Sequence, residues 1–337
     1  MHSTLIIGCG SIGERHLRCF QNTGRSKLTA CDTSAGLLEE MARKYKVPTS
    51  SNWAKAVASE EFDTVVVCTP AHLHIQMALL ALQSGKHVLI EKPLSHTLQG
   101  IPELLQARDA LGRQAAVAYV LHLYPLLIQA RDFLRSGVFG VIRHVTATSG
   151  QNFPSLRPAH AVHYSQTYYR DRQTGGGAIQ DALTHTVNWV ESVVGPTDSV
   201  LCDCAHQVLP SVTVEDTVNL SARNGEALVN YTLNQFQAPT ESTLQFNTAI
   251  GSVKIEIHNG RWGTYRLGDA GWTWREVPPL DRDAPFTSQA NLFLDQVEGQ
   301  PGRLCTIEAA VQTLRFNLAA LASGDSGRRV LCAQPEN

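Results

Sequence analysis

Hydrophobic and polar positions in the first third of the chain switch repeatedly between a strand pattern and a helix pattern. Short continuous apolar runs, typical of strands covered on both faces, occur at 5–7, 27–31, 64–68, 87–90 and 115–118. Stretches with a helical period of apolar residues follow them at 14–20, 37–45, 53–58, 75–83 and 97–111. This alternation predicts an α/β domain over residues 1–121, a doubly wound parallel sheet of the Rossmann type with helices on both faces.

The pattern changes after residue 121. Two-fold alternation of apolar and polar residues predicts strands at 141–148, 200–208, 214–222, 227–233, 242–249 and 253–257. Helical periods predict helices at 124–136, 178–194, 289–297 and 307–321. Asn224-Gly225 and Asn259-Gly260 are turn signals between strands. Residues 122–337 are therefore expected to form an α+β domain with a large, mostly antiparallel open sheet and helices on one of its faces.

Composition narrows the class of partner. The 337 residues are 43% hydrophobic and 17% charged, with a formal net charge of −2 and no block of Lys or Arg. These values argue against nucleic acid or an anionic membrane as the main partner. The other face of the open sheet is expected to serve subunit contact, in a homodimer or homotetramer, since a large sheet face rarely stays exposed.

The cysteines and the chain start predict a cytoplasmic location. Eight cysteines lie without C-x-x-C pairing, which favours reduced, packed thiols over disulfides. The first strand begins almost at once, so we expect no signal peptide ahead of it. No apolar run approaches the roughly 20 residues that span a bilayer. The histidines lack partners at ligand spacing, so no metal site is expected.

Three glycines break the first strand and open the first helix. Gly8, Gly10 and Gly13 fit the pattern G-x-G-x-x-G, with Ser11 and Ile12 between the last two. In a dinucleotide site, the first glycine turns the chain, the second admits the pyrophosphate, and the third lets helix and strand pack closely. Such a triplet can also be an ordinary turn. Its place after a strand and before a helix favours a bound dinucleotide.

Asp32 ends the second strand, where a ribose-binding carboxylate is expected. A carboxylate there accepts hydrogen bonds from both ribose hydroxyls and repels a 2′-phosphate. The following residues, Thr33 and Ser34, supply no arginine. The sequence therefore favours NAD, although the nearby Arg15 leaves NADP open.

Further polar residues stand where parallel strands end, the edge at which such sheets bind ligands. Thr69 and Pro70 follow one strand, with His74 in the next turn, and Glu91 and Lys92 follow another. Near the partial positive charge of a nicotinamide, Lys92 would lose proton affinity and become a candidate proton shuttle. A solvated loop lysine is the alternative interpretation.

The predicted helix after Gly175 to Gly177 carries a second polar group. Asp181, His185 and Asn188 are spaced i, i+4, i+7 and would form one stripe of an α-helix. A carboxylate one turn from an imidazole can hold it as an acid or base near neutral pH. A solvent-facing stripe with a helix-stabilising pair remains the alternative.

The loop at 150–174 is rich in hydrogen-bond donors. We single out Arg157, His163, Tyr164 and Tyr168 as candidate substrate contacts, and His160, Tyr169 and Arg170 share their chemistry. These side chains suit a polyhydroxylated ligand, with or without an anionic group. Surface or subunit-contact roles stay open for each of them.

Taken in order, these motifs carry a family resemblance. The glycine turn at 8–13, Thr69-Pro70 with His74, Glu91-Lys92-Pro93, and Gly175 to Gly177 with Asp181 and His185 together resemble the glucose–fructose oxidoreductase / inositol dehydrogenase / rhizopine catabolism (Gfo/Idh/MocA) family. The resemblance covers nearly the whole chain. It implies that Lys92 transfers a proton, that the turn around it shapes the nicotinamide pocket, and that His185 contacts the reacting hydroxyl or carbonyl while Asp181 fixes substrate or histidine.

One segment departs from the family pattern. Relatives commonly carry an Arg-Phe pair before the proline that opens the second domain, whereas this chain has His122-Leu123-Tyr124-Pro125. A histidine can replace the hydrogen bonds of an arginine but not its permanent charge. A substrate contact is therefore expected to be lost or changed here.

The sequence thus predicts an NAD(P)-dependent dehydrogenase or reductase acting on CH–OH groups of a sugar, cyclitol or related polyol. Its catalytic residues would be Lys92, His185 and Asp181, and its dinucleotide site would be formed at the strand ends. Two other functions stay open: an NAD-assisted elimination or hydrolysis on a sugar without net redox change, and a non-catalytic regulator that senses dinucleotide.

Overall fold

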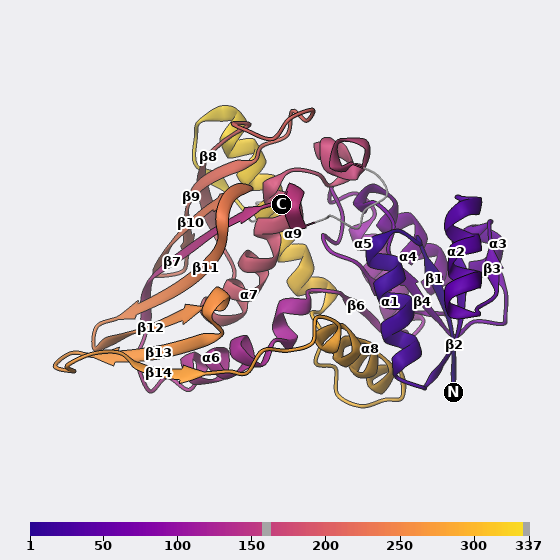
Figure 1. Cartoon of the computed structure of the whole chain (residues 1–337), viewed down its shortest axis with the longest axis horizontal. Coiled ribbons are helices and arrows are strands. Elements are labelled where there is room, and N and C mark those ends of the chain that lie inside the picture. Colours follow the sequence, from indigo (N-terminus) through magenta and orange to yellow (C-terminus); the bar gives the residue numbers. More distant parts are fainter. Residues whose placement is uncertain (157–162, 333–337) are drawn as a thin grey trace. The chain divides into compact units, whose positions relative to one another are not determined.

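The structure is a computed structural model that describes residues 1–156 and 163–332 (Figure 1). The chain divides into two compact units. Met1–Val120 and Asp281–Val311 form the first, and Leu121–Leu280 with the chain from Gln312 onward forms the second. The two units are described separately below.

The first unit contains a six-stranded parallel sheet in the order β3-β2-β1-β4-β5-β6. Its strands are β1 (His2–Ile7), β2 (Ser26–Cys31), β3 (Thr49–Ser50), β4 (Thr64–Val67), β5 (His87–Ile90) and β6 (Ala115–Val117). The register pairs Ile7 with both Cys31 and Val67, and Val67 with Ile90. The carboxyl ends of four strands are therefore level, and the residues that follow them share one edge of the sheet. The expected Rossmann sheet is confirmed.

Six helices accompany this sheet: α1 (Ser11–Asn22), α2 (Ala35–Tyr45), α3 (Trp53–Ala58), α4 (His74–Gln83), α5 (Ile101–Ala110) and α8 (Ala284–Val297). α2 begins after Ser34, whose hydroxyl accepts the Leu37 N–H as an N-cap. α5 begins four residues later than the pattern predicts. The reason is Gly100, which has φ +77° and whose position leaves no room for a side chain beside Ile75.

Residues 281–311 belong with the first unit, whereas the sequence predicted them in a second domain starting at 122. Phe293 of α8 packs edge-to-face on Phe20 of α1, with ring centroids 6.4 Å apart. Arg25 forms an ion pair with Asp295 at 2.8 Å, and the Val117 N–H donates to the Cys305 carbonyl. The apolar face of α8 thus completes the core on α1. The first division between the units falls after Val120, and the domain bounds 1–121 and 122–337 stay a prediction.

The second unit contains a nine-stranded sheet in the order β14-β13-β12-β11-β7-β10-β9-β8-β15. Its strands are β7 (Ile142–Asn152), β8 (Ser199–Ala205), β9 (Thr217–Asn224), β10 (Ala227–Asn234), β11 (Phe236–Thr248), β12 (Gly251–Glu256), β13 (Arg261–Arg266), β14 (Thr273–Glu276) and β15 (Val330–Leu331). The β7–β10 pair is parallel, and the other neighbouring pairs are antiparallel. The expected large, mostly antiparallel open sheet is confirmed.

Alternating burial along β9 and β10 gives this sheet a core face and a polar face. The core face packs with three helices, α6 (Pro125–Arg135), α7 (Thr184–Val194) and α9 (Ile307–Ser326), through buried residues such as Trp189, Phe246 and Phe316 (Figure 1). α9 continues from the first unit into the second, since the division falls after Val311. Short 3₁₀ turns lie at Pro154–Leu156, Tyr164–Gln166, Tyr168–Arg170 and Arg172–Thr174.

Candidate active site

The three glycines at the end of β1 differ in what surrounds them. Gly8 has φ +91°, and a Cβ there would lie 2.8 Å from the backbone of Cys68. A Cβ at Gly13 would lie 1.7 Å from the Gly8 carbonyl oxygen. A Cβ at Gly10 would meet nothing within 4 Å. Packing therefore requires Gly8 and Gly13, whereas Gly10 faces open space.

The N-terminus of α1 has the chemistry of an anion site. The helix begins at Ser11 after Gly10, and no side chain caps it. The first amides of a helix have no partner within the helix, and the helix dipole makes this end positive. The residues at 10–13 therefore fit the pyrophosphate of a dinucleotide, because donors are present and no Cβ fills the space at Gly10.

Asp32 lies beside this turn. Its Oδ2 accepts the Cys9 N–H at 2.7 Å, and its Oδ1 accepts the Ser34 N–H at 2.8 Å. The carboxylate is thereby fixed between the glycine turn and the start of α2. Each carboxylate oxygen keeps acceptor capacity for a further donor such as a ribose hydroxyl.

Thr69, Pro70 and His74 connect the ends of two strands. The His74 ring is buried, with Nε2 2.7 Å from the Thr69 carbonyl oxygen and Nδ1 3.0 Å from the Pro93 carbonyl oxygen. Burial lowers the pKa of His74, and the hydrogen bonds to the Thr69 and Pro93 carbonyls oppose this effect. His74 thus joins the segment after β4 to the turn after β5. A direct cofactor contact by these residues stays a prediction.

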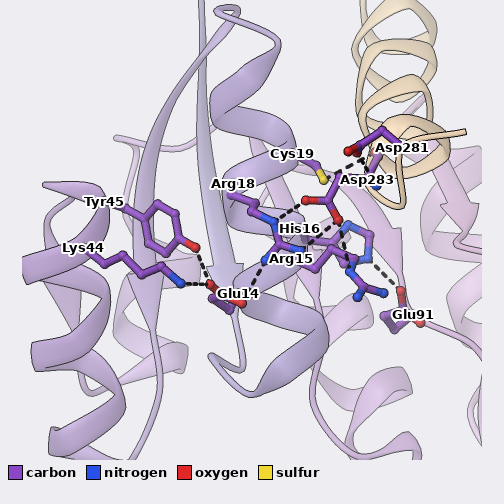
Figure 2. Close-up of polar contacts among 10 residues, drawn as sticks. All are labelled: Glu14, Arg15, His16, Arg18, Cys19, Lys44, Tyr45, Glu91, Asp281 and Asp283. Carbon is purple, nitrogen blue, oxygen red and sulfur yellow. Dashed lines mark hydrogen bonds and ion pairs between the residues drawn. The ribbon is translucent and has the colours of Figure 1, made fainter. Parts of the chain in front are cut away.

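The turn after β5 carries Glu91 and Lys92, and the Lys92–Pro93 peptide is cis. Glu91 is buried, and its Oε1 lies 2.6 Å from Nε2 of His16 on α1 (Figure 2). Its Oε2 accepts the Lys92 backbone N–H at 3.0 Å. Sequence reasoning missed His16. The signal that could have found it is a polar residue inside the apolar face of α1, beside Leu17 and one turn before Phe20.

The charged residues of α1 pair with one another, with Lys44 of α2 and with the segment before α8. Glu14 pairs with Lys44 and Arg18, and Arg18 also pairs with Asp283 (Figure 2). Nε of Arg15 lies 3.4 Å from Asp283, and the Arg15 guanidinium stacks over the Phe286 ring. Arg15, which left NADP open, thus already has an acidic partner.

In the second unit, the helix predicted over 178–194 is two segments. A π-helical turn spans Ile179–Leu183, and α7 follows from Thr184. A π-turn has a longer repeat than an α-helix, so it breaks the stripe expected from the spacing of Asp181, His185 and Asn188. Asp181 is buried and accepts a hydrogen bond from the Tyr168 hydroxyl at 2.8 Å. His185 is half-buried in the first turn of α7.

Asn188 belongs to a buried network with His122. Nε2 of His122 lies 2.7 Å from Asn188 Oδ1, and Asn188 Nδ2 donates to Thr313 Oγ1 at 2.9 Å. The Thr313 hydroxyl donates in turn to Glu191 at 2.7 Å. Burial raises the pKa of Glu191, and the hydrogen bonds to its carboxylate oppose this. Burial also lowers the pKa of His122, and the neighbouring Arg131 adds to this effect.

Arg131 lies beside His122, the position where the chain departs from the family pattern. Its guanidinium lies 3.4 Å from Nδ1 of His122. A neutral His122 can accept from Arg131 and donate to Asn188 at the same time. A permanent positive charge is therefore present beside His122, on α6.

The candidate substrate residues of the 150–174 loop have different environments. Arg157, with His160, lies outside the described residues. Tyr164 is buried against Phe153 and Tyr169, and its hydroxyl donates to the Pro210 carbonyl. His163 is exposed and bonds Ser165, Tyr168 reaches Asp181, and Arg170 is exposed. Tyr164 therefore has a packing role, and the substrate role of each residue stays a prediction.

Three findings concern the chain more widely. In the described parts of the chain, no helix is long and apolar enough to cross a membrane. Over the same residues, no group of three or more His, Cys, Asp and Glu side chains could hold a metal ion. All eight cysteines are described, and each is a free thiol.

A Rossmann sheet with a glycine turn and an acidic residue directly after β2, joined to a unit with a large open sheet, defines a two-domain dinucleotide-binding protein. Residues 3–119 match the model of an oxidoreductase family with an NAD-binding Rossmann fold, GFO_IDH_MocA. Residues 127–258 match the GFO/IDH/MocA C-terminal domain. The chain belongs to the Gfo/Idh/MocA oxidoreductase family, and its first unit is the NAD-binding domain of that family.

Among curated relatives, the chain is 30% identical over 130 residues to the uncharacterized oxidoreductase ORF334 of Rhizobium meliloti. This match covers 39% of this chain and 36% of the relative. It is 27% identical over 165 residues to levoglucosan dehydrogenase of Pseudarthrobacter phenanthrenivorans, and this match covers 49% of this chain and 41% of the relative. The matched segments thus span less than half the length of these relatives. A solved structure of levoglucosan dehydrogenase with NADH has the same fold, with a TM-score of 0.87, 18% identity and 99% of both chains covered.

Proposed function

We propose that this chain is an NAD-dependent dehydrogenase that acts on a CH–OH group of a sugar, cyclitol or related polyol. The observation that carries the proposal is the arrangement at one edge of the first sheet. An uncapped helix N-terminus, a fixed Asp32 carboxylate and Lys92 all follow strands that end at the same level. In such sheets this edge is where dinucleotides and their substrates bind.

The residues that would hold the cofactor are those of the glycine turn and of the neighbouring strand ends. We assign Gly8, Gly10, Ser11, Ile12, Gly13, Asp32, Thr69, Pro70, His74, Glu91 and Lys92 to this role. When bound, NAD would supply an acceptor for the hydrogen and electron pair that leave the carbinol carbon. Asp32 would select the unphosphorylated ribose by charge repulsion against a 2′-phosphate.

Lys92 and His185 would share the proton of the reacting hydroxyl. Proton transfer by a positioned side chain typically contributes 10²- to 10⁴-fold in rate. The buried Asp181, held by Tyr168, would orient either the imidazole or the substrate. Arg157, His163, Tyr164 and Tyr168 are the proposed sources of substrate contacts in the 150–174 loop.

The relatives suggest the class of substrate, a ring with several hydroxyl groups. One is named levoglucosan dehydrogenase and another, from Salmonella, inositol 2-dehydrogenase. We further propose that the chain works in the cytoplasm, where its free thiols would stay reduced. The polar face of the nine-stranded sheet is the proposed contact in a homodimer or homotetramer.

The test is a steady-state assay of NAD reduction with a panel of levoglucosan, inositol and glucose. We expect NADH to accumulate in proportion to a polyol consumed. Lys92→Met should lower kcat by about 10²-fold or more with little change in the Kd for NAD. Lys55→Met, at an exposed position of α3, is the matched control and should leave kcat unchanged.

Other outcomes would point to the other functions. Conversion of a sugar with only catalytic amounts of NAD and no net NADH would favour elimination or hydrolysis. Tight NAD binding with no conversion of any polyol would favour a dinucleotide sensor, provided that Lys92→Met leaves the NAD binding unchanged. Either result would contradict the proposed dehydrogenase.

A further inference from the structure

A buried imidazole–carboxylate pair joins the first helix to the turn that carries Lys92. His16 on α1 is 0% exposed and Glu91 after β5 is 4% exposed. Nε2 of His16 lies 2.6 Å from Oε1 of Glu91 (Figure 2). The His16 ring is enclosed by Phe20 and by Phe286, which meets it edge-on with centroids 5.9 Å apart.

The pair is costly as a purely stabilising device. A buried carboxylate loses its hydration, and replacing both partners of a buried hydrogen-bonded pair by apolar side chains of the same shape can be nearly neutral or stabilising. Apolar neighbours such as Leu17 and Phe20 occupy the same helix face. What the pair supplies instead is a fixed direction for the Glu91 carboxylate.

The second carboxylate oxygen of Glu91, held in this orientation, binds the backbone of Lys92. Oε2 accepts the backbone N–H of Lys92 at 3.0 Å, while Oε1 faces His16. One carboxylate therefore spans from the imidazole of α1 to the amide of Lys92. α1 is also the helix whose first turn, at Gly10 and Ser11, has the free N-terminal amides.

We propose that His16, acting through Glu91, is a positioning residue that holds the backbone of Lys92 in register with the dinucleotide turn. The two residues move no proton of the substrate. They fix the position of the Lys92 backbone relative to α1. The contacts from His16 through Glu91 to the Lys92 amide therefore set the distance between the lysine and a dinucleotide bound at α1. The inference rests on the catalytic role proposed for Lys92.

Two His16 variants separate position from stability. His16→Leu removes the contact to Glu91 and leaves an apolar side chain, whereas His16→Gln keeps an N–H donor. Glu91→Gln keeps the shape of the side chain and removes its charge. The matched control is Thr4→Val near the amino ends of β1 and β4. This variant removes the buried hydrogen bond between the Thr4 and Thr64 hydroxyls (2.7 Å, both residues 0% exposed).

The first measurement is amide hydrogen exchange at 88–95 in the protein without dinucleotide or substrate. We expect His16→Leu to speed exchange of the Lys92 amide about tenfold or more, His16→Gln to restore most of the protection, and Thr4→Val to leave it unchanged. The second measurement is kinetic. His16→Leu should lower kcat about tenfold to a hundredfold through misplacement of Lys92, with KM and the Kd for NAD changed less.

Each outcome decides the matter. Normal exchange at Lys92 in folded His16→Leu protein would overturn the inference, as would equal effects of Thr4→Val and His16→Leu. If His16→Leu does not fold, the same comparison is made with Glu91→Gln, which must then speed exchange at Lys92. If exchange changes as expected while Lys92→Met keeps full activity, the positioning contact stands and the proposed function fails.

Discussion

The carboxylate of Asp32 holds two backbone amides before any ligand is present. It accepts from Cys9 in the glycine turn and from Ser34 at the start of α2. Its negative charge is therefore fixed at the end of β2 rather than free to swing away. A fixed carboxylate discriminates between ribose hydroxyls and a 2′-phosphate more strongly than a mobile one, because it cannot avoid the phosphate.

Replacing this charge should change cofactor preference. We expect Asp32→Ser to weaken NAD binding about tenfold and to shift the NAD:NADP preference toward NADP by about tenfold or more. Isothermal titration with both dinucleotides measures the two Kd values. Glu39→Gln, at an exposed position of α2, makes the same change of net charge and should leave the ratio as it is. An unchanged ratio in Asp32→Ser would contradict the role of Asp32.

At the scale of elements, the β1–α1 connection separates packing from binding. Gly13 lies against the Gly8 carbonyl, so that any side chain there collides with the backbone of the turn. Gly10 faces open space beside the first turn of α1. Within four positions, glycine is therefore needed for two different reasons: packing at Gly13 and space for a ligand at Gly10.

Single methyl groups test this difference. Gly13→Ala should destabilise the first unit strongly, by about 3 kcal/mol or more, because the backbone must move to admit the Cβ. Gly10→Ala should change the free energy of unfolding little and weaken NAD binding at least tenfold, since its methyl group enters the space of the pyrophosphate. Urea unfolding and NAD titration of both variants give the comparison. Equal effects of the two variants on folding would contradict this account of the turn.

The sequence predicted most of these elements, and the exceptions have physical reasons. The π-turn at Ile179–Leu183 could not be seen, because the spacing of Asp181 and His185 fits an ordinary α-helix as well. The strands β13 and β14 were missed, since segments with Trp262, Gly263 and Trp274 do not alternate simply between apolar and polar. Periodicity reports which face of an element is apolar, and these segments lack a clear period.

At the scale of the whole molecule, the order of the chain hides which elements share a core. α8 follows strands β7 to β14 of the second sheet in sequence but packs on α1 of the first unit, through Phe293 and Phe20. An amphipathic pattern states that a helix needs a partner, but not which sheet supplies it. For the same reason, the chemistry of strand ends predicted Lys92 and Asp32, whereas His16 and the His122–Asn188 network depend on contacts far apart in sequence.

The central claim concerns where the hydrogen of the carbinol carbon goes. The most direct measurement uses the polyols of the assay panel with deuterium on their carbinol carbons, together with NAD and the full chain, and analyses the dinucleotide by mass spectrometry. The account predicts that the deuterium appears on the dinucleotide in step with loss of polyol, and that Lys92→Met greatly slows this transfer. A polyol that is converted while the dinucleotide stays unlabelled would contradict it.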